Sequence, residues 1–438
     1  MRDMTQEVLD FVKENDVKFI RLGFCDPFGM HKNISVMADE LETAFKQGVS
    51  FDASAIKGFR DITQSDLLLF PDPATLTVLP WRPEPGRVVR FYCDVRHPDG
   101  TVFPRDSRYL LKRVIQRCES MGYVCTIGAE CEFYLFKTDS QGAPTLETLD
   151  NGGYLDISPL DNGENIRREI CLCLEEMGLR PESSHHEQGP GQNEIDFKFS
   201  DALSSADNFL TFKSVVKSIA ARNGLFASFM PKPLMDRSGS GLHVNISLSR
   251  DGLNIFKSGE EHSKEAESFI AGVLKKTREM TLFLNPIANS YERFGKCEAP
   301  KYVSWSHQNR SQLVRIPAAA REKVRMELRS PDPSLNPYLA FALILAAGLD
   351  GIEAKLPLPP AVDVNLYNAD EEALRGLEKL PATLPDALAA AADSAFVKKV
   401  IGGELLMEYV ELKKAEAARF ARCSDVETFY KENYLYIY

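Results

Sequence analysis

The chain has 438 residues, of which 44% are hydrophobic and 26% charged, a composition typical of globular proteins with two or three domains. Its formal net charge of -11 argues against a nucleic-acid-binding protein, because phosphate contacts favour a basic surface. The longest apolar run, 338–349, is too short to cross a bilayer, no secretory signal opens the chain, and the nine cysteines show no paired spacing. These features predict a cytoplasmic protein with reduced thiols and without membrane or nucleic-acid partners.

The N-terminal part of the chain predicts a small α/β unit. Its pattern indicates a helix over 6–13 and strands over 17–24, 34–37, 76–79 and 88–95. The proline-rich segment 80–86 predicts a stiff turn. Segment 97–104 predicts a boundary, so we expect an N-terminal domain over 1–104 and a larger domain over 105–438.

The larger domain mixes strands with amphipathic helices. The helical period predicts helices over 108–121, 166–177, 208–223, 263–280, 337–355, 384–394 and 403–422. The helix over 337–355 follows Asn336-Pro337, which is a helix-start signal. The expected fold class is α+β.

A strand predicted over 123–136 carries two carboxylates on one face. Glu130 and Glu132 alternate with Cys131 and Phe133, which fall on the opposite face. Adjacent carboxylates repel each other and resist burial unless cations neutralise them. The alternative for this segment alone is an ordinary solvated strand face.

The same alternation recurs in three further strands, predicted over 194–199, 241–248 and 324–329. In the first of them the apolar face is Ile195, Phe197 and Phe199. The polar faces of the three strands carry Glu194 and Asp196, then His243, Asn245 and Ser247, then Arg325, Glu327 and Arg329. Four such strands predict one polar cavity lined by a sheet.

The residue types in this cavity favour hard divalent cations. Five carboxylates and one imidazole are available: Glu130, Glu132, Glu187, Glu194, Glu327 and His243. Oxygen-rich sites with an occasional imidazole suit Mg²⁺ or Mn²⁺ better than Zn²⁺. Two such ions would offset the carboxylate charge and leave coordination positions for phosphate oxygens.

Arginines cluster in the same part of the sequence. Arg310, Arg315, Arg325 and Arg329 lie within 310–329, and Arg293 and Glu298 precede them. Arginines near divalent metals suit phosphoryl transfer, although a lone arginine is more often a surface ion-pair partner. The sequence contains no Walker-type phosphate loop, no GxGxxG and no CxxC pair.

Several motifs together resemble bacterial type I glutamine synthetases. They are FDASAI (51–56), GAECEF (128–133), HHE (185–187), GQNE (191–194), MPKP (230–233), GSGLH (239–243), NP (285–286), NSY (289–291), NRS (309–311), RIP (315–317), ELRSPDP (327–333) and NLY (365–367). They follow the family order over nearly the whole chain, which is more specific than any single motif. The resemblance implies a β-grasp-like N-terminal domain and a larger catalytic domain with a curved antiparallel sheet flanked by helices. It also implies a homododecamer of two stacked six-membered rings with active sites at subunit interfaces.

The resemblance also implies the site residues. Glu132, Glu187 and Glu194 would hold one metal ion, and Glu130, His243 and Glu327 the other. Glutamate or its phosphorylated form would contact Arg293, Arg310, Arg329 and Gly239. The nucleotide would contact Glu182, Asn245, Ser247, Arg315 and Arg325. Glu298 would lie on a flap over the acyl phosphate, and Asp52 of a neighbouring subunit would attract ammonium together with Tyr154 and Glu187.

The implied reaction joins ammonia to glutamate at the expense of ATP through γ-glutamyl phosphate. Four positions depart from the family pattern: Ala53, Ala55, Ser238 and Asn245 stand where Gly, Ser, Asn and His are usual. Tyr367 matches the tyrosine that is adenylylated in some members, although the chain length resembles the other branch. Two alternatives stay open: a ligase that uses a larger amine, and a catalytically silent ring.

Overall fold

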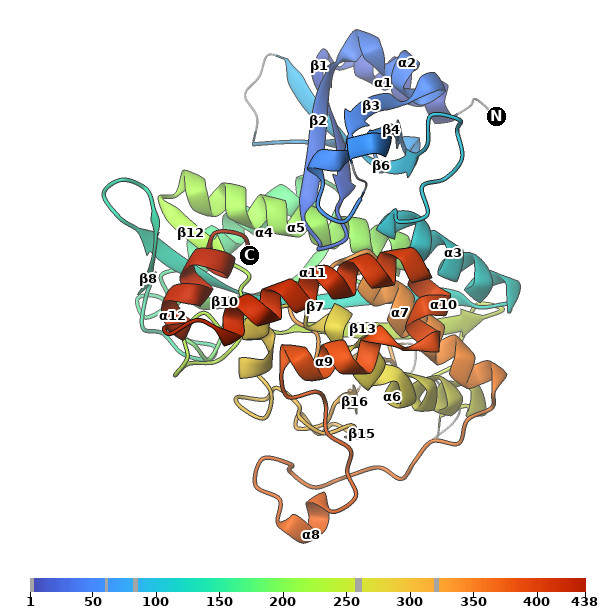
Figure 1. Ribbon diagram of the computed structural model, residues 1–438. Coiled ribbons are helices and arrows are strands. Elements are labelled where there is room, and N and C mark those ends of the chain that lie inside the picture. The colour runs from blue at the N-terminus through green and yellow to red at the C-terminus, as the bar shows by residue number, and fades with distance from the viewer. Residues whose placement is uncertain (1–3, 60–61, 82–85, 257–261, 319–322) are drawn as a thin grey trace.

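The structure, a computed structural model, describes residues 4–59, 62–81, 86–256, 262–318 and 323–438. A small N-terminal sheet stands on a larger body of helices around a second sheet (Figure 1). This arrangement confirms the α+β fold class. The domain boundary at residue 104 stays a prediction.

The N-terminal sheet has six strands in the order β2-β1-β6-β4-β3, with β5 paired to β6. Its strands are β1 (Val17–Cys25), β2 (His31–Met37), β3 (Val49–Asp52), β4 (Asp66–Pro71), β5 (Thr77–Val78) and β6 (Arg87–Arg96), and its helices are α1 (Met4–Glu14) and α2 (Leu41–Gln47). The parallel pairing of β1 with β6 is the central feature of this β-grasp arrangement. Ile20, Leu22, Val89 and Phe91 are fully buried in its core.

The predicted helix over 6–13 and the four predicted N-terminal strands are confirmed. The sequence pattern did not predict α2, β3 or β4, which are short and therefore show little periodicity. Most of the predicted turn over 80–86 lies outside the described residues.

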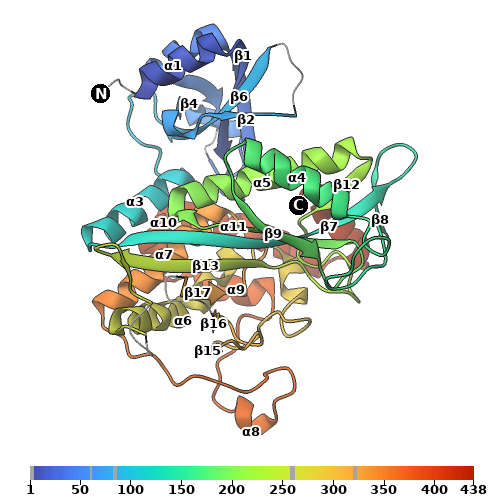
Figure 2. The same cartoon turned by 180° about the vertical axis from the view of Figure 1, so that it is seen from behind.

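The larger sheet has eleven strands, with the path β15-β16-β17-β13-β7-β10-β9. The strands are β7 (Val124–Thr138), β8 (Pro144–Thr148), β9 (Pro181–His186), β10 (Gln192–Phe197), β11 (Ser200–Asp201), β12 (Leu225–Ser228), β13 (Leu242–Arg250), β14 (Leu253–Asn254), β15 (Trp305–His307), β16 (Val314–Ile316) and β17 (Met326–Leu328). Apart from the β15–β16 pair, the neighbouring strands are antiparallel. The long strands β7 and β13 cross the whole domain side by side (Figure 2).

Helices pack against this sheet and against one another. They are α3 (Ser107–Ser120), α4 (Glu164–Glu176), α5 (Ala202–Arg222), α6 (Lys264–Leu284), α7 (Pro337–Glu353), α8 (Glu371–Leu374), α9 (Leu384–Ala392), α10 (Ala395–Ile401), α11 (Gly403–Ala421) and α12 (Val426–Tyr430). All seven helices predicted for this domain are confirmed, and Asn336 caps α7 by accepting hydrogen bonds from the amides of Tyr338 and Leu339. Among the described residues, no helix combines the length and apolar character needed to cross a membrane.

The predicted alternation of the central strands is confirmed with one exception. Cys131 and Phe133 of β7 are fully buried, and the Phe133 ring packs against Phe212 of α5 with 6.0 Å between centroids. The opposite face of the strand carries the carboxylates. Phe199 is the exception: β10 ends at Phe197, and Phe199 is 64% exposed rather than part of the apolar face.

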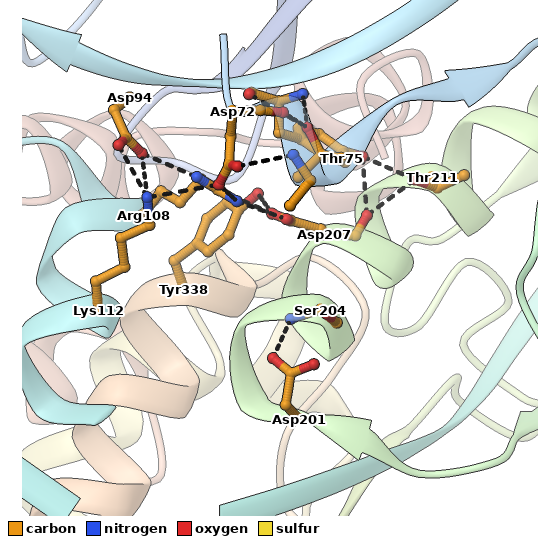
Figure 3. Close-up of polar contacts among 12 residues, drawn as sticks. Asp72, Thr75, Asp94, Arg108, Lys112, Asp201, Ser204, Asp207, Thr211 and Tyr338 are labelled. Carbon is orange, nitrogen blue, oxygen red and sulfur yellow. Dashed lines mark hydrogen bonds and ion pairs between the residues drawn. The ribbon is translucent and has the colours of Figure 1, made fainter. Parts of the chain in front are cut away.

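One buried arginine joins the N-terminal sheet to the helices below it (Figure 3). Arg108 of α3 donates two hydrogen bonds to Asp207 of α5, at 3.1 and 3.0 Å. It also donates to Asp94 of β6 at 2.8 Å and to Asp72 at 2.9 Å. The Tyr338 hydroxyl of α7 donates to Asp207 as well. One guanidinium therefore contacts three carboxylates from different elements, of which Asp94 also pairs with Lys112.

We expect Arg108→Met to lower the stability of the folded chain by about 3–5 kcal/mol, because it leaves the buried Asp207 carboxylate without its cation. Thermal unfolding followed by circular dichroism measures the effect. Lys112→Met is the matched control: Lys112 contacts Asp94 from a half-exposed position and should contribute at most about 1 kcal/mol. Equal effects of the two substitutions would contradict the role of the buried network.

Candidate active site

The four strands with charged faces line one cavity of about 520 Å³. The register of the sheet explains why their side chains meet. On β7, Glu130 lies opposite His243 of β13 on one side and Asp196 of β10 on the other. Glu132 lies opposite Glu194 of β10. Residues that are far apart in sequence are therefore neighbours on one sheet face, as the alternation predicted.

The first carboxylate group consists of Glu130, His243 and Glu327. Their potential ligand atoms all lie within 4.8 Å of one another. His243 Nδ1 is 3.4 Å from Glu130 Oε2 and 3.7 Å from Glu327 Oε1. Burial alone would raise the pKa of Glu130, but His243, Asn245 and the charge of Arg325 lower it. Glu130 is therefore held as a carboxylate.

Two arginines hold Glu327, which is fully buried. Arg315 and Arg329 each donate to one of its carboxylate oxygens at 2.5 Å. Arg329 is only 1% exposed, and the neighbouring carboxylate of Glu327 raises its pKa despite burial. This half of the cavity therefore carries its own compensating charge.

The second carboxylate group is Glu132, Glu187 and Glu194, and it has less compensation. Glu132 accepts hydrogen bonds from the Gly241 amide at 2.8 Å and from Gln192 at 3.1 Å. The nearest cationic candidate for the other two is His185, at 3.7 Å from Glu187 and 3.9 Å from Glu194. Burial and the charge of Glu132 raise the pKa of both Glu187 and Glu194.

These carboxylates fit a divalent cation. Like charges held together in a buried place are stable only when protonated or paired with a cation, and the ligands are oxygens with one imidazole at each group. The predicted set Glu130, His243 and Glu327 occurs as one cluster. Glu187 and Glu194 cluster with His185, and Glu194 also clusters with Glu130 and Asp196, whereas Glu132 lines the cavity outside these clusters.

The rim of the cavity carries the remaining arginines and the predicted flap. Glu298 has φ = 64° and lies 3.7 Å from Arg329 and 3.9 Å from Arg310. Arg293 is 3% exposed, and it donates to the Ser330 carbonyl at 3.0 Å. Gly239 lies against the Arg293 side chain, because a Cβ there would come within 2.6 Å of it.

A second cavity, of about 1080 Å³, adjoins the first and shares Glu130, Asp196, Ala318 and Arg325 with it. Three residues predicted for nucleotide contact, Glu182, Asn245 and Ser247, line it. Arg325 lines both cavities, and its Nε donates to Asn245 Oδ1 at 2.7 Å. Arg315 lines only the first cavity, where it holds Glu327.

Asp52 is the predicted site residue that this chain does not bring to the cavity. It ends β3 in the N-terminal sheet, is exposed, and accepts hydrogen bonds from the Ser54 amide at 2.9 Å and hydroxyl at 2.6 Å. Those hydrogen bonds lower its pKa. Neither cavity described above includes it among its lining residues in the described part of the chain.

Sequence reasoning missed several residues of the cavity. His185 faces Tyr154, with 5.5 Å between ring centroids, and Cys297 of the flap lines the cavity while the other eight cysteines do not. The buried His186 ring does not line the cavity; its Nε2 forms a hydrogen bond with Asp150 Oδ1 at 2.9 Å and so fixes the segment before Glu187. The alternation of 183–187 as a strand could have placed His185 and Glu187 on one face, since β9 pairs with β10.

Comparisons with known proteins agree with this architecture. Residues 16–98 match the family described as "Glutamine synthetase, beta-Grasp domain", and residues 104–430 match "Glutamine synthetase, catalytic domain". A glutamine synthetase of Methanosarcina mazei is 48% identical over 94% of this chain and 93% of its own length. One of Clostridium saccharobutylicum is 47% identical over 98% of both chains. The chain belongs to the glutamine synthetase family of ligases.

Solved structures agree as well. A chain described as "GmaS/ADP complex-Conformation 1" superposes with a TM-score of 0.87 at 31% identity, covering 99% of both chains. Another described as "Apo GmaS without ligand" gives the same TM-score and identity, covering 99% of this chain and 100% of that one. The family implies a divalent metal and ATP, which fits the carboxylate clusters.

The raised pKa values of Glu187 and Glu194 predict a pH-dependent metal effect. In the unfolded chain these groups titrate near 4.5, so the metal-free folded protein binds their protons more tightly. The contribution of these two groups to its stability is therefore fully present below that pH and is lost as the pH rises through the folded values. Divalent cations require the deprotonated groups, so their stabilising effect should grow over the same range.

Thermal unfolding with and without Mn²⁺ across this pH range tests the prediction. Glu194→Gln removes one of the two groups, so we expect higher stability without metal and a smaller gain with metal. A metal effect that is independent of pH, or equal in the variant, would contradict it.

Proposed function

We propose that this protein ligates ammonia to L-glutamate at the expense of ATP, giving L-glutamine, ADP and phosphate through a γ-glutamyl phosphate intermediate. The observation that carries the proposal is the junction of two cavities: one combines buried carboxylate clusters with arginines, and the other adjoins it at Glu130 and Arg325. Such a junction suits transfer of a phosphoryl group from a nucleotide to a second substrate. The names of the relatives, 48% and 47% identical, support the same activity.

Glu132, Glu187 and Glu194 would hold one divalent ion, and Glu130, His243 and Glu327 the other, with Mg²⁺ or Mn²⁺ as the ions. When bound, these ions supply charge neutralisation for the transferred phosphoryl group. Glu182, Asn245, Ser247, Arg315 and Arg325 would contact the nucleotide. The neighbour described as an ADP complex supports the binding of a nucleotide.

The chain's own residues would position glutamate and protect the intermediate. Arg293, Arg310 and Arg329, with Gly239, would bind its carboxylates, and the γ-carboxylate would attack the terminal phosphorus of ATP with ADP as the leaving group. Glu298 on the flap would close over the acyl phosphate and exclude water, which otherwise hydrolyses it. Ammonium would lose a proton to a carboxylate, and the resulting ammonia would displace phosphate from the acyl carbon.

The ammonium site would need a second copy of the chain. Asp52 lies outside the cavity of its own chain, while Tyr154 and Glu187 line it. Beside Tyr154, Leu155, Ile157 and Leu160 are 57%, 77% and 59% exposed, an apolar surface that a neighbouring subunit would cover. These features support a site at a subunit interface, and a dodecamer of two stacked hexameric rings is the assembly that the family resemblance implies. A cytoplasmic location is part of the same proposal.

The central experiment measures phosphate release from ATP with glutamate and Mg²⁺ or Mn²⁺, with and without ammonium, together with glutamine formation. We expect ammonium-dependent phosphate release matched by glutamine. Glu327→Ala should reduce turnover by a factor of at least about 10³, because it removes a cluster carboxylate and the shortest ion pair of both Arg315 and Arg329. Phosphate release that depends on a larger amine instead of ammonium would identify a related ligase for that amine. Inactivity under every condition would favour a catalytically silent homologue that forms a ring.

Asp52→Ala should impair the use of ammonium more than the formation of acyl phosphate, because the lost carboxylate attracts the cation and takes its proton. The ratio of glutamine to total phosphate released measures this. Asp99→Ala is the matched control, since Asp99 makes the same two hydrogen bonds, to the Thr101 amide at 2.9 Å and hydroxyl at 2.6 Å. Equal loss of both partial reactions would reject the assigned role.

A further inference from the structure

A third cavity, of about 360 Å³, lies between the N-terminal sheet and helix α5. Both views show α5 directly beneath this sheet (Figures 1 and 2). Its walls combine apolar side chains, among them Trp81, with five basic ones: Arg21, His31, Arg90, Lys213 and Lys217. Among the described residues, no aspartate or glutamate lines it.

The hydrogen bonds of Arg90, Lys213 and Lys217 in the described part of the chain go to uncharged groups. Arg90 donates to the hydroxyls of Thr211 and Tyr92, and it is 6% exposed. Its buried Nε has no hydrogen-bond partner. Lys213 and Lys217 donate to the carbonyls of Pro333 and Ile437, both at 2.8 Å. A buried guanidinium usually has a carboxylate partner, so this charge is uncompensated.

Burial and neighbouring positive charges both lower the pKa values of basic groups in this cavity. Burial, Arg90 and Arg21 lower the pKa of His31 to about 3. Burial and the adjacent Lys213 lower the pKa of Lys217 to about 7. The His31 Nε2 atom is also buried without a hydrogen-bond partner. A negative charge placed among these groups would stabilise their protonated forms and raise their pKa values.

We propose that this cavity is a second ligand site, separate from the active site, that binds a small organic anion carrying carboxylate or phosphate groups. Lys213 and Lys217 lie on one face of α5, four residues apart, and Arg90 reaches the same space from β6. The acid groups of the ligand pair with these cations, and its body packs on Trp81. The site bridges the two parts of the chain, and Lys213 connects it to the loop after β17 through Pro333.

Trp81 is a built-in reporter, because the chain has 2 tryptophans. In a Trp305→Phe background, Trp81 fluorescence is titrated with phosphate or succinate in the absence of metal and ATP, with chloride holding ionic strength constant. We expect a saturable change with at least one of these anions and none with uncharged succinamide. The preferred anion then identifies the acid group. Absence of saturation with both anions would overturn the proposal.

Lys217→Gln should weaken the anion by a factor of about ten or more, since one charge-assisted contact is lost, and Lys217→Arg should restore binding. Arg222→Gln is the matched control: it removes a positive charge from the same helix, outside the cavity, and should leave binding unchanged. Equal weakening by Lys217→Gln and Arg222→Gln would show mere long-range attraction and overturn the site. The titration uses no turnover, so its failure is distinct from failure of the proposed ligase activity.

Discussion

The structure is organised around the burial of like charges on one face of a sheet. β7 runs through the middle of the larger sheet, and its alternation forces Glu130 and Glu132 to the same side. Pairing with β10 and β13 then adds Glu194, Asp196 and His243. Isolated carboxylates in such a place are strongly unfavourable, so every neighbouring element has to supply compensation.

The compensation is unequal across the cavity. Glu327 has two arginines at 2.5 Å, whereas the ion-pair partner of Glu187 and Glu194 among the described residues is His185, at 3.7 and 3.9 Å. We therefore expect the charge state of Glu187 and Glu194, and their contribution to stability, to depend most on a bound cation. This asymmetry links stability, metal binding and the proposed chemistry, because the same groups take part in all three.

Buried positive charges occur at two other places in the structure, one with carboxylate partners and one without them among the described lining residues. At the domain junction, Arg108 pairs with Asp207, Asp94 and Asp72, and Lys112 adds a second cation beside Asp94, so these carboxylates have cationic partners within the chain. A few residues away, the cavity above α5 gathers basic groups without an acidic one among its described lining residues. The paired network joins elements of the chain, whereas the basic cavity is the place where we propose that an anion binds.

The sequence by itself determined the α+β class, the long helices and the sheet faces, because period and alternation are local properties that packing preserved. It also identified Glu130, Glu194 and His243 as residues that line one cavity, with Glu327 next to Glu130 and His243, since their strands share a polar face. The tertiary structure decided the strand order, the short elements α2, β3 and β4, and the exposure of Phe199. It also decided that His185 joins the carboxylates, that Asp52 lies away from them in its own chain, and that Arg90 and Lys217 share a cavity. These facts depend on pairing between segments far apart in sequence, which no local pattern encodes.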